Sequence, residues 1–142
     1  MANVSFNPNE RSISEFMKAI CQHDKVLTAT RQSNELTVEI CLKVRTRMRV
    51  LMTNLYCVGE ADVREFLDNH PSIDVVVTLS AWNLVSLDAT LYGRQRTKGV
   101  FTWKAFFGAL NYEKYWLYED LPDGLDGEKL VAERKRRAID WN

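Results

Sequence analysis

The chain has 142 residues, of which 46% are hydrophobic and 27% are charged, with only 3 Pro and 6 Gly. This composition excludes a disordered chain, a collagen-like repeat and a small disulfide-stapled scaffold, and the length suits one domain. The 19 basic and 19 acidic residues cancel, and the apolar runs are too short to span a membrane, so we expect a cytoplasmic protein with no membrane partner.

The N-terminal part of the chain begins with a predicted helix. Ser12-Ile-Ser-Glu15 has the pattern of a capping box, in which a hydroxyl and a carboxylate satisfy backbone N–H groups at a helix start. Ile13, Phe16 and Ile20 follow at helical spacing. We therefore expect a helix over about residues 13–22, with these apolar side chains facing the core.

Alternating polar and apolar residues predict strands after this helix. Residues 25–31 form the first, and the alternation over residues 36–42 predicts a second strand with one buried face, after a turn at Ser33-Asn34. Val50–Tyr56 is a denser apolar run, which is typical of a strand covered on both sides. Because one strand through all of these residues would be unusually long, we expect a turn or bend near residues 44–47.

The second half of the chain repeats a strand–helix unit, which implies neighbouring parallel strands joined by right-handed crossovers. The expected units are Val50–Tyr56 with a helix from about Ala61 to His70, Ile73–Leu79 with a helix after Ser86, and Gly99–Thr102 with a helix capped by Thr102. The middle helix carries the apolar residues Leu87, Leu91 and Tyr92.

Together these elements predict a single α/β domain. We expect a mixed sheet of about five strands, antiparallel on its N-terminal side and parallel on its C-terminal side, flanked by helices. Residues 1–111 are expected to form the core domain, and residues 112–142 an aromatic and charged appendage packed on the same domain. A charged helix over about residues 127–141 is expected to end this appendage.

The cysteines and glycines give no sign of a cofactor. Cys21, Cys41 and Cys57 have no short spacing and no companion histidines, which excludes a CxxC zinc or redox site. We expect them to be buried thiols in a reducing compartment. Since no glycine-rich loop follows any predicted strand, we expect no nucleotide cofactor, and the cysteine spacing gives no reason to expect a metal.

The first candidate site consists of four basic residues at alternate positions, Lys43, Arg45, Arg47 and Arg49. On an extended strand they would project from one face about 6.6 Å apart, close to the separation of successive phosphates along one nucleic-acid strand. On a turn they would gather at a hairpin tip. Two other interpretations stay open, a charged strand edge that discourages edge-to-edge pairing and ion pairing with Glu35 and Glu39.

The second candidate site is a set of polar and aromatic residues near the ends of the predicted parallel strands, namely Thr53, Asn54, Thr78, Ser80, Trp82, Asn83, Thr102 and Trp103. Ligands of open α/β sheets bind beyond the carboxyl ends of the strands, so these residues are candidates for a pocket that stacks on a flat ligand. The alternative is that the hydroxyl side chains only cap helices and close turns.

A third basic cluster lies in the expected last helix, over residues 133–137. It fits contact with nucleic acid or an acidic partner. A solvated helix face, balanced by nearby acidic residues, is the alternative.

The order helix, three strands, helix, strand resembles the core of the restriction-endonuclease-like PD-(D/E)xK nucleases. The resemblance covers about residues 12–110, and the stretch from Ile73 through Leu110 is similar in style to the closing strand–helix–strand–helix of such proteins. It implies a nuclease-like fold around a mixed sheet. The family's catalytic signature, an Asp and a Glu on Mg²⁺ with a Lys two residues beyond the Glu, is missing from this chain.

The carboxylates of the predicted strands do not restore that signature. Cys41 stands where the lysine would follow Glu39, and Lys43 lies roughly 13 Å from Glu39 along an extended strand, too far to share one metal ion. The run over residues 50–56 holds no carboxylate. If metal-dependent hydrolysis occurred, Glu35, Glu39 and Lys43 would be the candidate catalytic residues and Mg²⁺ the cofactor.

The sequence therefore favours a non-catalytic interaction or regulatory module with a nuclease-like fold, which contacts nucleic acid through the basic residues 43–49. A metal-dependent nuclease with an irregular active site is the first alternative. The second is a protein–protein adaptor or homodimer that uses the aromatic residues Tyr115, Trp116 and Tyr118.

Overall fold

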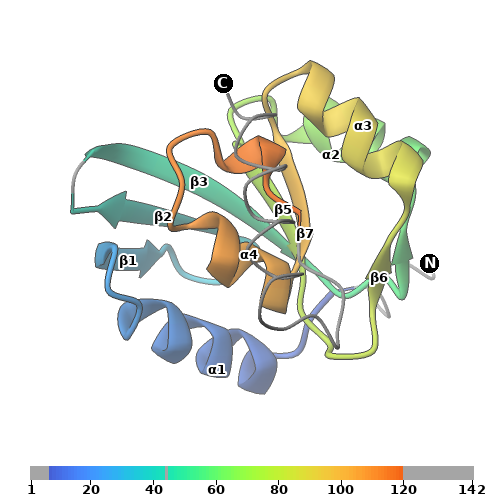
Figure 1. Ribbon diagram of the computed structural model, residues 1–142. Coiled ribbons are helices and arrows are strands. Elements are labelled where there is room, and N and C mark those ends of the chain that lie inside the picture. Colours follow the sequence, from blue (N-terminus) through green and yellow to red (C-terminus); the bar gives the residue numbers. More distant parts are fainter. Residues whose placement is uncertain (1–6, 44, 120–142) are drawn as a thin grey trace, which may run out of the picture.

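The computed structural model describes residues 7–43 and 45–119 (Figure 1). The helices are α1 (Glu10–Cys21), α2 (Glu60–Asn69), α3 (Leu87–Gln95) and α4 (Trp103–Ala109), followed by one turn of 3-10 helix, η2 (Tyr115–Leu117). The strands are β1 (Val26–Arg31), β2 (Thr37–Leu42), β3 (Arg45–Thr53), β4 (Cys57–Val58), β5 (Val75–Thr78), β6 (Leu84–Val85) and β7 (Gly99–Thr102). Within these ranges, no helix has the length and apolar character needed to cross a membrane.

The main sheet has the strand order β1-β2-β3-β5-β7. β1, β2 and β3 pair antiparallel, whereas β3, β5 and β7 pair parallel. The predicted α/β fold with a mixed five-stranded sheet is thus confirmed. The strands β4 and β6 pair in a separate two-stranded parallel sheet, which was not predicted because strands of 2 residues show no periodicity.

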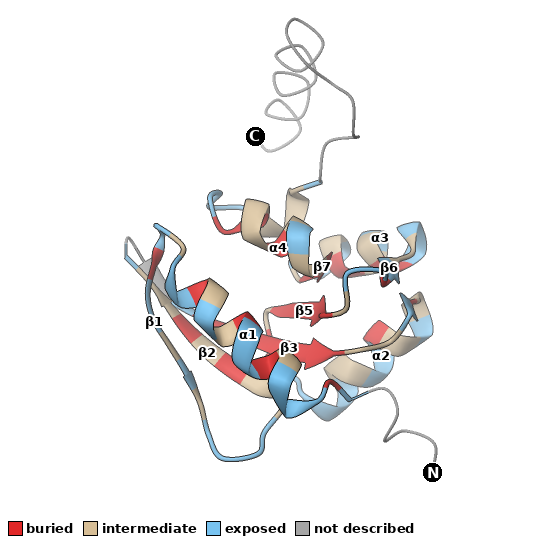
Figure 2. Cartoon of the chain, turned by 90° about the horizontal axis from the view of Figure 1, so that it is seen from below, coloured by how far each residue is buried: buried red, intermediate tan, exposed pale blue. Residues whose placement is uncertain are grey.

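Helices cover the two faces of the sheet unequally. α1 and α4 pack on one face, around a core that includes Phe16, Val50 and Phe106. α2 and α3 pack on the other face, against a second core that includes Val76 and Val100. Figure 1 shows α2 and α3 at the β5–β7 end of the sheet, whereas the β2–β3 hairpin extends away from them. Figure 2 shows buried residues concentrated in β3 and β5 and exposed residues along the β1–β2 connection.

α1 begins at Glu10 rather than near residue 13. Its N-cap is Asn9, not Ser12, and the Asn9 Oδ1 accepts a hydrogen bond from the Ser12 N–H at 2.8 Å. Asparagine caps a helix as well as serine does. The earlier start also places Glu10 where its carboxylate binds Arg31 of β1. The apolar face predicted for this helix is buried as expected.

The turn between β2 and β3 comes earlier than the expected residues 44–47. β2 ends at Leu42, and β3 already begins at Arg45. β3 then ends at Thr53, so the strand predicted over 50–56 is shifted toward the N-terminus. The physical reason is that basic residues alternate with apolar ones at the start of β3, which suits a strand with one polar and one buried face.

α3 packs on the sheet through its small residues rather than through its leucines. Ala89 and Gly93 are buried against the sheet, whereas Leu87 is 71% exposed and Leu91 is 42% exposed. The helix approaches β7 so closely that a Cβ on Gly93 would lie 2.7 Å from the carbonyl oxygen of Lys98. Only small side chains fit between this helix and the sheet.

The other predicted features of the helices are confirmed. α2 ends at Asn69, just before His70-Pro71. Tyr92 of α3 is partly buried in the core beneath α2 and α3. Thr102 caps α4, since its Oγ1 accepts a hydrogen bond from the Ala105 N–H at 3.3 Å.

The cysteines are not the buried thiols that were expected. Cys21 and Cys57 are exposed, Cys41 is partly exposed, and all three are free. Cys41 follows the buried Ile40 along β2, so its side chain lies on the opposite face of the strand. The expectation followed the general tendency of cysteine to be buried and ignored this alternation.

The described part of the C-terminal appendage packs on the domain. Tyr115 and Tyr118 contact the core beneath α1 and α4. Burial raises the pKa of Tyr115 to about 12, because the phenolate would lose its hydration. The expected helix over 127–141 and the basic cluster at 133–137 lie outside the described residues.

Candidate nucleic-acid interface

The half of the sheet that α2 and α3 leave uncovered presents a polar face. Residues opposite each other in an antiparallel sheet lie on the same face, so the register defines its rows. The two rows over β1, β2 and β3 are Thr28–Cys41–Arg47 and Thr30–Glu39–Arg49. All six residues are exposed or partly exposed. The next row pairs Thr37 with the buried Leu51, so the face becomes apolar only beside α2.

Basic residues gather at the end of this face that adjoins the β2–β3 turn. Arg45, Arg47 and Arg49 occupy alternate positions of β3, whereas Lys43 lies in the turn and is exposed. The predicted row of four is therefore divided between a strand and a turn. The Lys43 N–H donates to the carbonyl oxygen of Lys25 at 2.9 Å, which places the exposed Lys25 beside it. Sequence spacing gave no signal for Lys25, because only the β1–β2 pairing brings it here.

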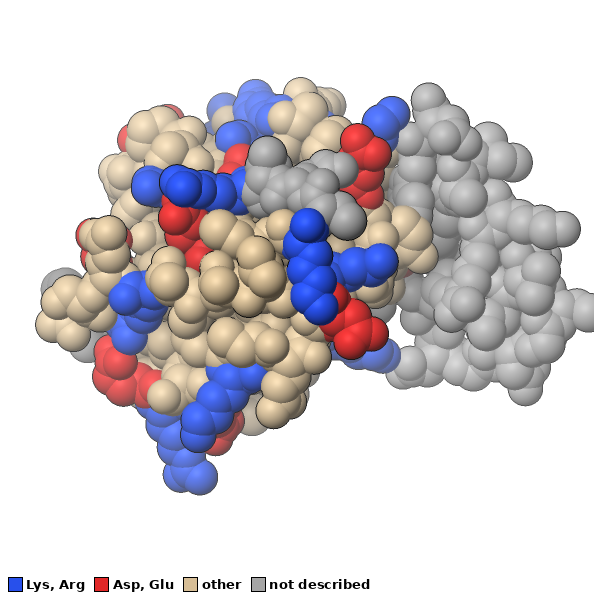
Figure 3. All heavy atoms as spheres, turned by 90° about the vertical axis from the view of Figure 1, so that its left-hand side faces the viewer, with Lys and Arg blue, Asp and Glu red and all other residues tan. Residues whose placement is uncertain are grey.

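Arg47 and Arg49 differ in how firmly they are held. Arg49 Nη1 donates to Ser72 Oγ at 3.1 Å. Arg47 Nη1 lies 4.0 Å from Glu39 Oε2, and the Arg47 side chain is 73% exposed. An exposed pair at this distance contributes about 0–1 kcal/mol, so Glu39 does not prevent Arg47 from meeting a phosphate. Figure 3, seen from the hairpin end, shows basic side chains interspersed with acidic ones rather than merged into one basic area.

Protection of a strand edge does not explain these arginines. β3 lies inside the sheet, between β2 and β5, and the edge strands are β1 and β7. The backbone groups of β3 are therefore paired on both sides, and a charge on its outward face shields no open edge. Of the interpretations left open by the sequence, phosphate contact and weak ion pairing with Glu39 remain.

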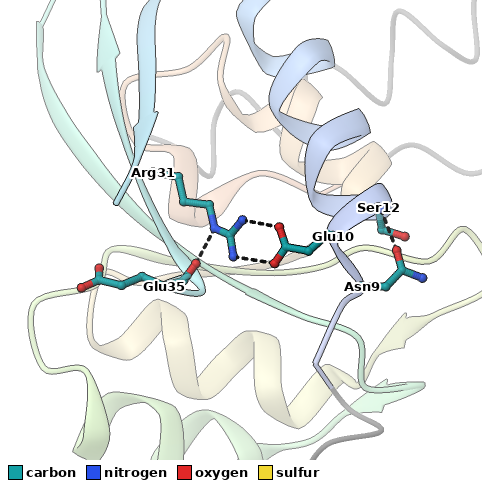
Figure 4. Close-up of polar contacts among 5 residues, drawn as sticks. All are labelled: Asn9, Glu10, Ser12, Arg31 and Glu35. Carbon is teal, nitrogen blue, oxygen red and sulfur yellow. Dashed lines mark hydrogen bonds and ion pairs between the residues drawn. The ribbon is translucent and has the colours of Figure 1, made fainter. Parts of the chain in front are cut away.

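At the end of β1 away from the β2–β3 turn, Arg31 lies on the side of the sheet that α1 covers, since Thr30 before it belongs to the open face. The guanidinium of Arg31 donates to both carboxylate oxygens of Glu10, at 2.8 and 3.1 Å, and to the carbonyl oxygen of Glu35 (Figure 4). The hydrogen bonds from Arg31 lower the pKa of the Glu10 carboxyl. The Glu35 carboxylate points away from this pair in Figure 4 and accepts a hydrogen bond from Thr37 Oγ1 at 3.2 Å. The β1–β2 connection is thus tied to the start of α1.

Three neighbouring depressions, which share wall residues and which together we call the groove, lie along this face. The first, of about 170 Å³, has Glu35, Glu39 and Arg49 in its wall. The second, of about 410 Å³, shares Glu35 and Arg49 and reaches His70 at the end of α2. The third, of about 260 Å³, shares His70 and continues past Phe66. Sequence reasoning missed the α2 wall of this groove, because the crossover from β3 to β5 sets its position.

The three residues nominated for metal-dependent catalysis are not brought together. Glu35 and Glu39 line the same depression, whereas Lys43 lies beyond the other end of β2. Within residues 7–43 and 45–119, no group of three or more His, Cys, Asp and Glu side chains is placed to hold a metal ion.

The second candidate site is partly assembled, as a hydrogen-bonded network. Asn54 Oδ1 accepts hydrogen bonds from Ser80 N–H at 3.2 Å, Ser80 Oγ at 2.5 Å and Asn83 Nδ2 at 2.9 Å. Asn83 Nδ2 also donates to Thr78 Oγ1 at 2.8 Å. Thr53 is buried at the end of β3. The network ties the loop after β3 to the loop after β5, which favours the structural interpretation of these residues.

The remaining three residues of that predicted site lie apart from the network. Thr102 caps α4. The Trp103 ring packs edge-on against Phe16 of α1, with ring centres 5.1 Å apart, and so belongs to the core. Trp82 is exposed on the surface. The two tryptophans therefore do not face one another across a ligand pocket.

Comparisons with models of known protein families, with curated proteins and with solved structures found no match. The function is therefore inferred from the geometry of the described residues.

Proposed function

We propose that the protein is a non-catalytic binding module with a nuclease-like fold, which contacts the phosphate backbone of nucleic acid through the basic end of its open sheet face. The residues of this basic end are Lys25, Lys43, Arg45, Arg47 and Arg49. Lysine and arginine side chains on an accessible surface bind phosphates and release their counterions, whatever the base sequence.

The observation that carries this proposal is the uneven cover of the sheet. α2 and α3 pack on this face only toward β5 and β7, and the polar rows over β1, β2 and β3 stay exposed beside them. A flat face of this kind, with Arg47 and Arg49 on neighbouring rows, is accessible to the backbone of a nucleic acid.

The nuclease-like part of the proposal rests on element order. In the main sheet and its first two helices the order is α1, β1, β2, β3, α2 and β5. This is the order helix, three strands, helix, strand that suggested the resemblance.

The acidic residues limit the size of the contact. Glu35 and Glu39 share a depression with Arg49, so a phosphate chain is repelled beyond Arg49 and its contact stays toward the hairpin end. Contact with about three or four phosphates would lower the affinity for a duplex by about 40- to 150-fold between roughly 50 and 200 mM salt.

Fluorescence anisotropy tests the proposal, with labelled single- and double-stranded DNA and RNA, at low and near-physiological salt, in the presence of Mg²⁺. Arg47→Ala is expected to weaken binding. It should also reduce the slope of log affinity against log salt concentration by about 1, because one phosphate contact is lost. Arg11→Ala is the matched control, since Arg11 is an exposed arginine of α1 with its own exposed ion pair to Glu15.

Three results would contradict the proposal. Absence of binding at low salt would exclude nucleic acid as the partner. Equal losses in Arg47→Ala and Arg11→Ala would show that the open face is not the binding surface. Mg²⁺-dependent cleavage of the probe that is lost in Glu39→Ala would instead establish the nuclease alternative.

A further inference from the structure

The groove continues beyond Arg49, the last residue of the basic end. Two of its depressions, of about 410 and 260 Å³, follow one another from Arg49 toward Phe66 and share His70 as a wall residue. Sites for small organic groups are concave surfaces of this kind, lined by apolar and aromatic side chains with a few polar groups among them. The proposed phosphate contacts leave this part of the groove unused.

One wall of the groove is a single side of α2. Asp62, Phe66 and Asn69 lie at positions i, i+4 and i+7 of the helix, and all three line the depression of about 260 Å³. The His70 N–H donates to the Phe66 carbonyl oxygen at 2.8 Å, so His70 continues this side at the end of the helix. Phe66 is partly buried, whereas Asn69 and His70 are exposed. The wall therefore combines a phenyl ring, an amide and an imidazole, which are groups that proteins use to stack on nucleobases and to hydrogen-bond to their edges.

Apolar side chains of the sheet and of the chain that follows it line the same part of the groove. Leu36, just before β2, lines both depressions, and Leu51 and Leu55 line the one beside α2. Leu36 and Leu55 are partly exposed. A flat, largely apolar group that enters the groove would therefore remove apolar surface from water.

The charges of the groove favour a phosphate at one end and an uncharged group beyond it. The guanidinium of Arg49 donates to Ser72 Oγ at 3.1 Å, and both residues line the depression of about 410 Å³. Beyond Arg49 the walls carry the carboxylates of Glu35, Asp62 and Glu65. These carboxylates repel a second phosphate. A base is uncharged, and its amino groups donate hydrogen bonds to carboxylate and amide oxygens.

We propose, on the basis of the proposed function, that the groove binds one unpaired base of a single-stranded nucleic acid whose phosphate lies on Arg49. The basic end and the groove meet at Arg49, so one nucleotide can contact both. A base of a duplex is paired and stacked inside the helix, whereas an unpaired base is free to turn toward the protein. Packing of one base on an aromatic side chain strengthens binding by about 5- to 150-fold. The protein should therefore prefer single strands to duplexes.

Three labelled DNA probes of equal length test the inference by fluorescence anisotropy at near-physiological salt: a single strand, a duplex, and a single strand of abasic sites, which keeps the phosphates and lacks the bases. The single strand is expected to bind at least about fivefold more tightly than either of the others. Phe66→Leu and His70→Ala should each reduce this preference and leave the affinity for the duplex unchanged. Phe107→Leu is the matched control, because Phe107 is a partly buried phenylalanine of α4 on the covered face of the sheet, and it should change neither affinity.

The inference would be overturned if the single strand binds no more tightly than the abasic strand. It would also be overturned if Phe66→Leu and His70→Ala both retain the full preference, since the base would then lie elsewhere. In either case the proposed function stands as long as Arg47→Ala weakens binding to the duplex. Because His70 is exposed, His70→Ala keeps the test decisive even if Phe66→Leu impairs folding. Absence of binding to all three probes would contradict the proposed function together with this inference.

Discussion

At Gly93, a methyl group would lie 2.7 Å from the carbonyl oxygen of Lys98 and 2.9 Å from Cγ2 of Val100. This close approach decides which side of α3 faces the sheet. Helical periodicity alone does not identify this side, because it ranks residues by hydrophobicity and not by the space available. The only local signal for the true orientation was the pair of small residues, Ala89 and Gly93, one helical turn apart.

Gly93→Ala is expected to lower the free energy of unfolding by about 1–3 kcal/mol, because either the helix or β7 must shift to make room for the methyl group. Urea unfolding followed by circular dichroism measures the change. Gly59→Ala is the control, since its added Cβ would meet its nearest neighbour, Asp62 Oδ2, at an ordinary 3.6 Å. That variant should lose less than about 1 kcal/mol, and equal losses in both variants would contradict the close approach of α3.

Among the elements, those with one buried and one polar face were the easiest to predict. α1, β1, β2 and α2 appear near their expected positions, because a periodic apolar pattern is the direct result of burying one face. The start of β3 was missed because its exposed positions include Arg47 and Arg49, and a charged segment resembles a turn. β4 and β6 exist only through their pairing with each other, which no local pattern encodes.

The residue Thr97, just after the C-terminal end of α3, has a backbone conformation that is unfavourable for a β-branched residue. Thr97 has φ of 58°, in the left-handed region, and its N–H donates to the Arg94 carbonyl oxygen at 3.0 Å. The Lys98 N–H donates to the Gly93 carbonyl oxygen at 2.8 Å. These two bonds form a Schellman motif, in which glycine is the usual residue at the left-handed position and a β-branched residue is strained.

Thr97→Gly is therefore expected to raise the free energy of unfolding by about 1 kcal/mol, by removing the clash of Cβ with the backbone. Thermal unfolding of the two proteins measures the gain as a higher melting temperature. Thr97→Ala, which keeps the Cβ, should gain little. A melting temperature lower for Thr97→Gly than for the wild type would show that the left-handed conformation is not the source of strain.

At the scale of the whole molecule, two surfaces of different chemistry lie at opposite ends of the sheet. The basic end of the open face adjoins the β2–β3 turn, whereas α3, which carries the exposed Leu87 and Leu91, lies at the β5–β7 end of the sheet. The sequence identified most of the basic residues, because they alternate along one strand. It did not predict that the face beneath them stays open, since this depends on where the crossover helices α2 and α3 come to rest. His70 joins the face for the same reason, whereas Lys25 joins it through the pairing of β1 with β2.

An NMR titration of ¹⁵N-labelled protein with a short DNA duplex at low salt tests most directly whether the open sheet face binds nucleic acid. The largest amide shift changes are predicted at Lys25, at Lys43 and along Arg47–Arg49, where the phosphates are expected to lie. The amides of α1 and α4, on the covered face, should keep their positions. Shift changes confined to α1 and α4, or none at all, would contradict the assignment of the open face as the binding surface.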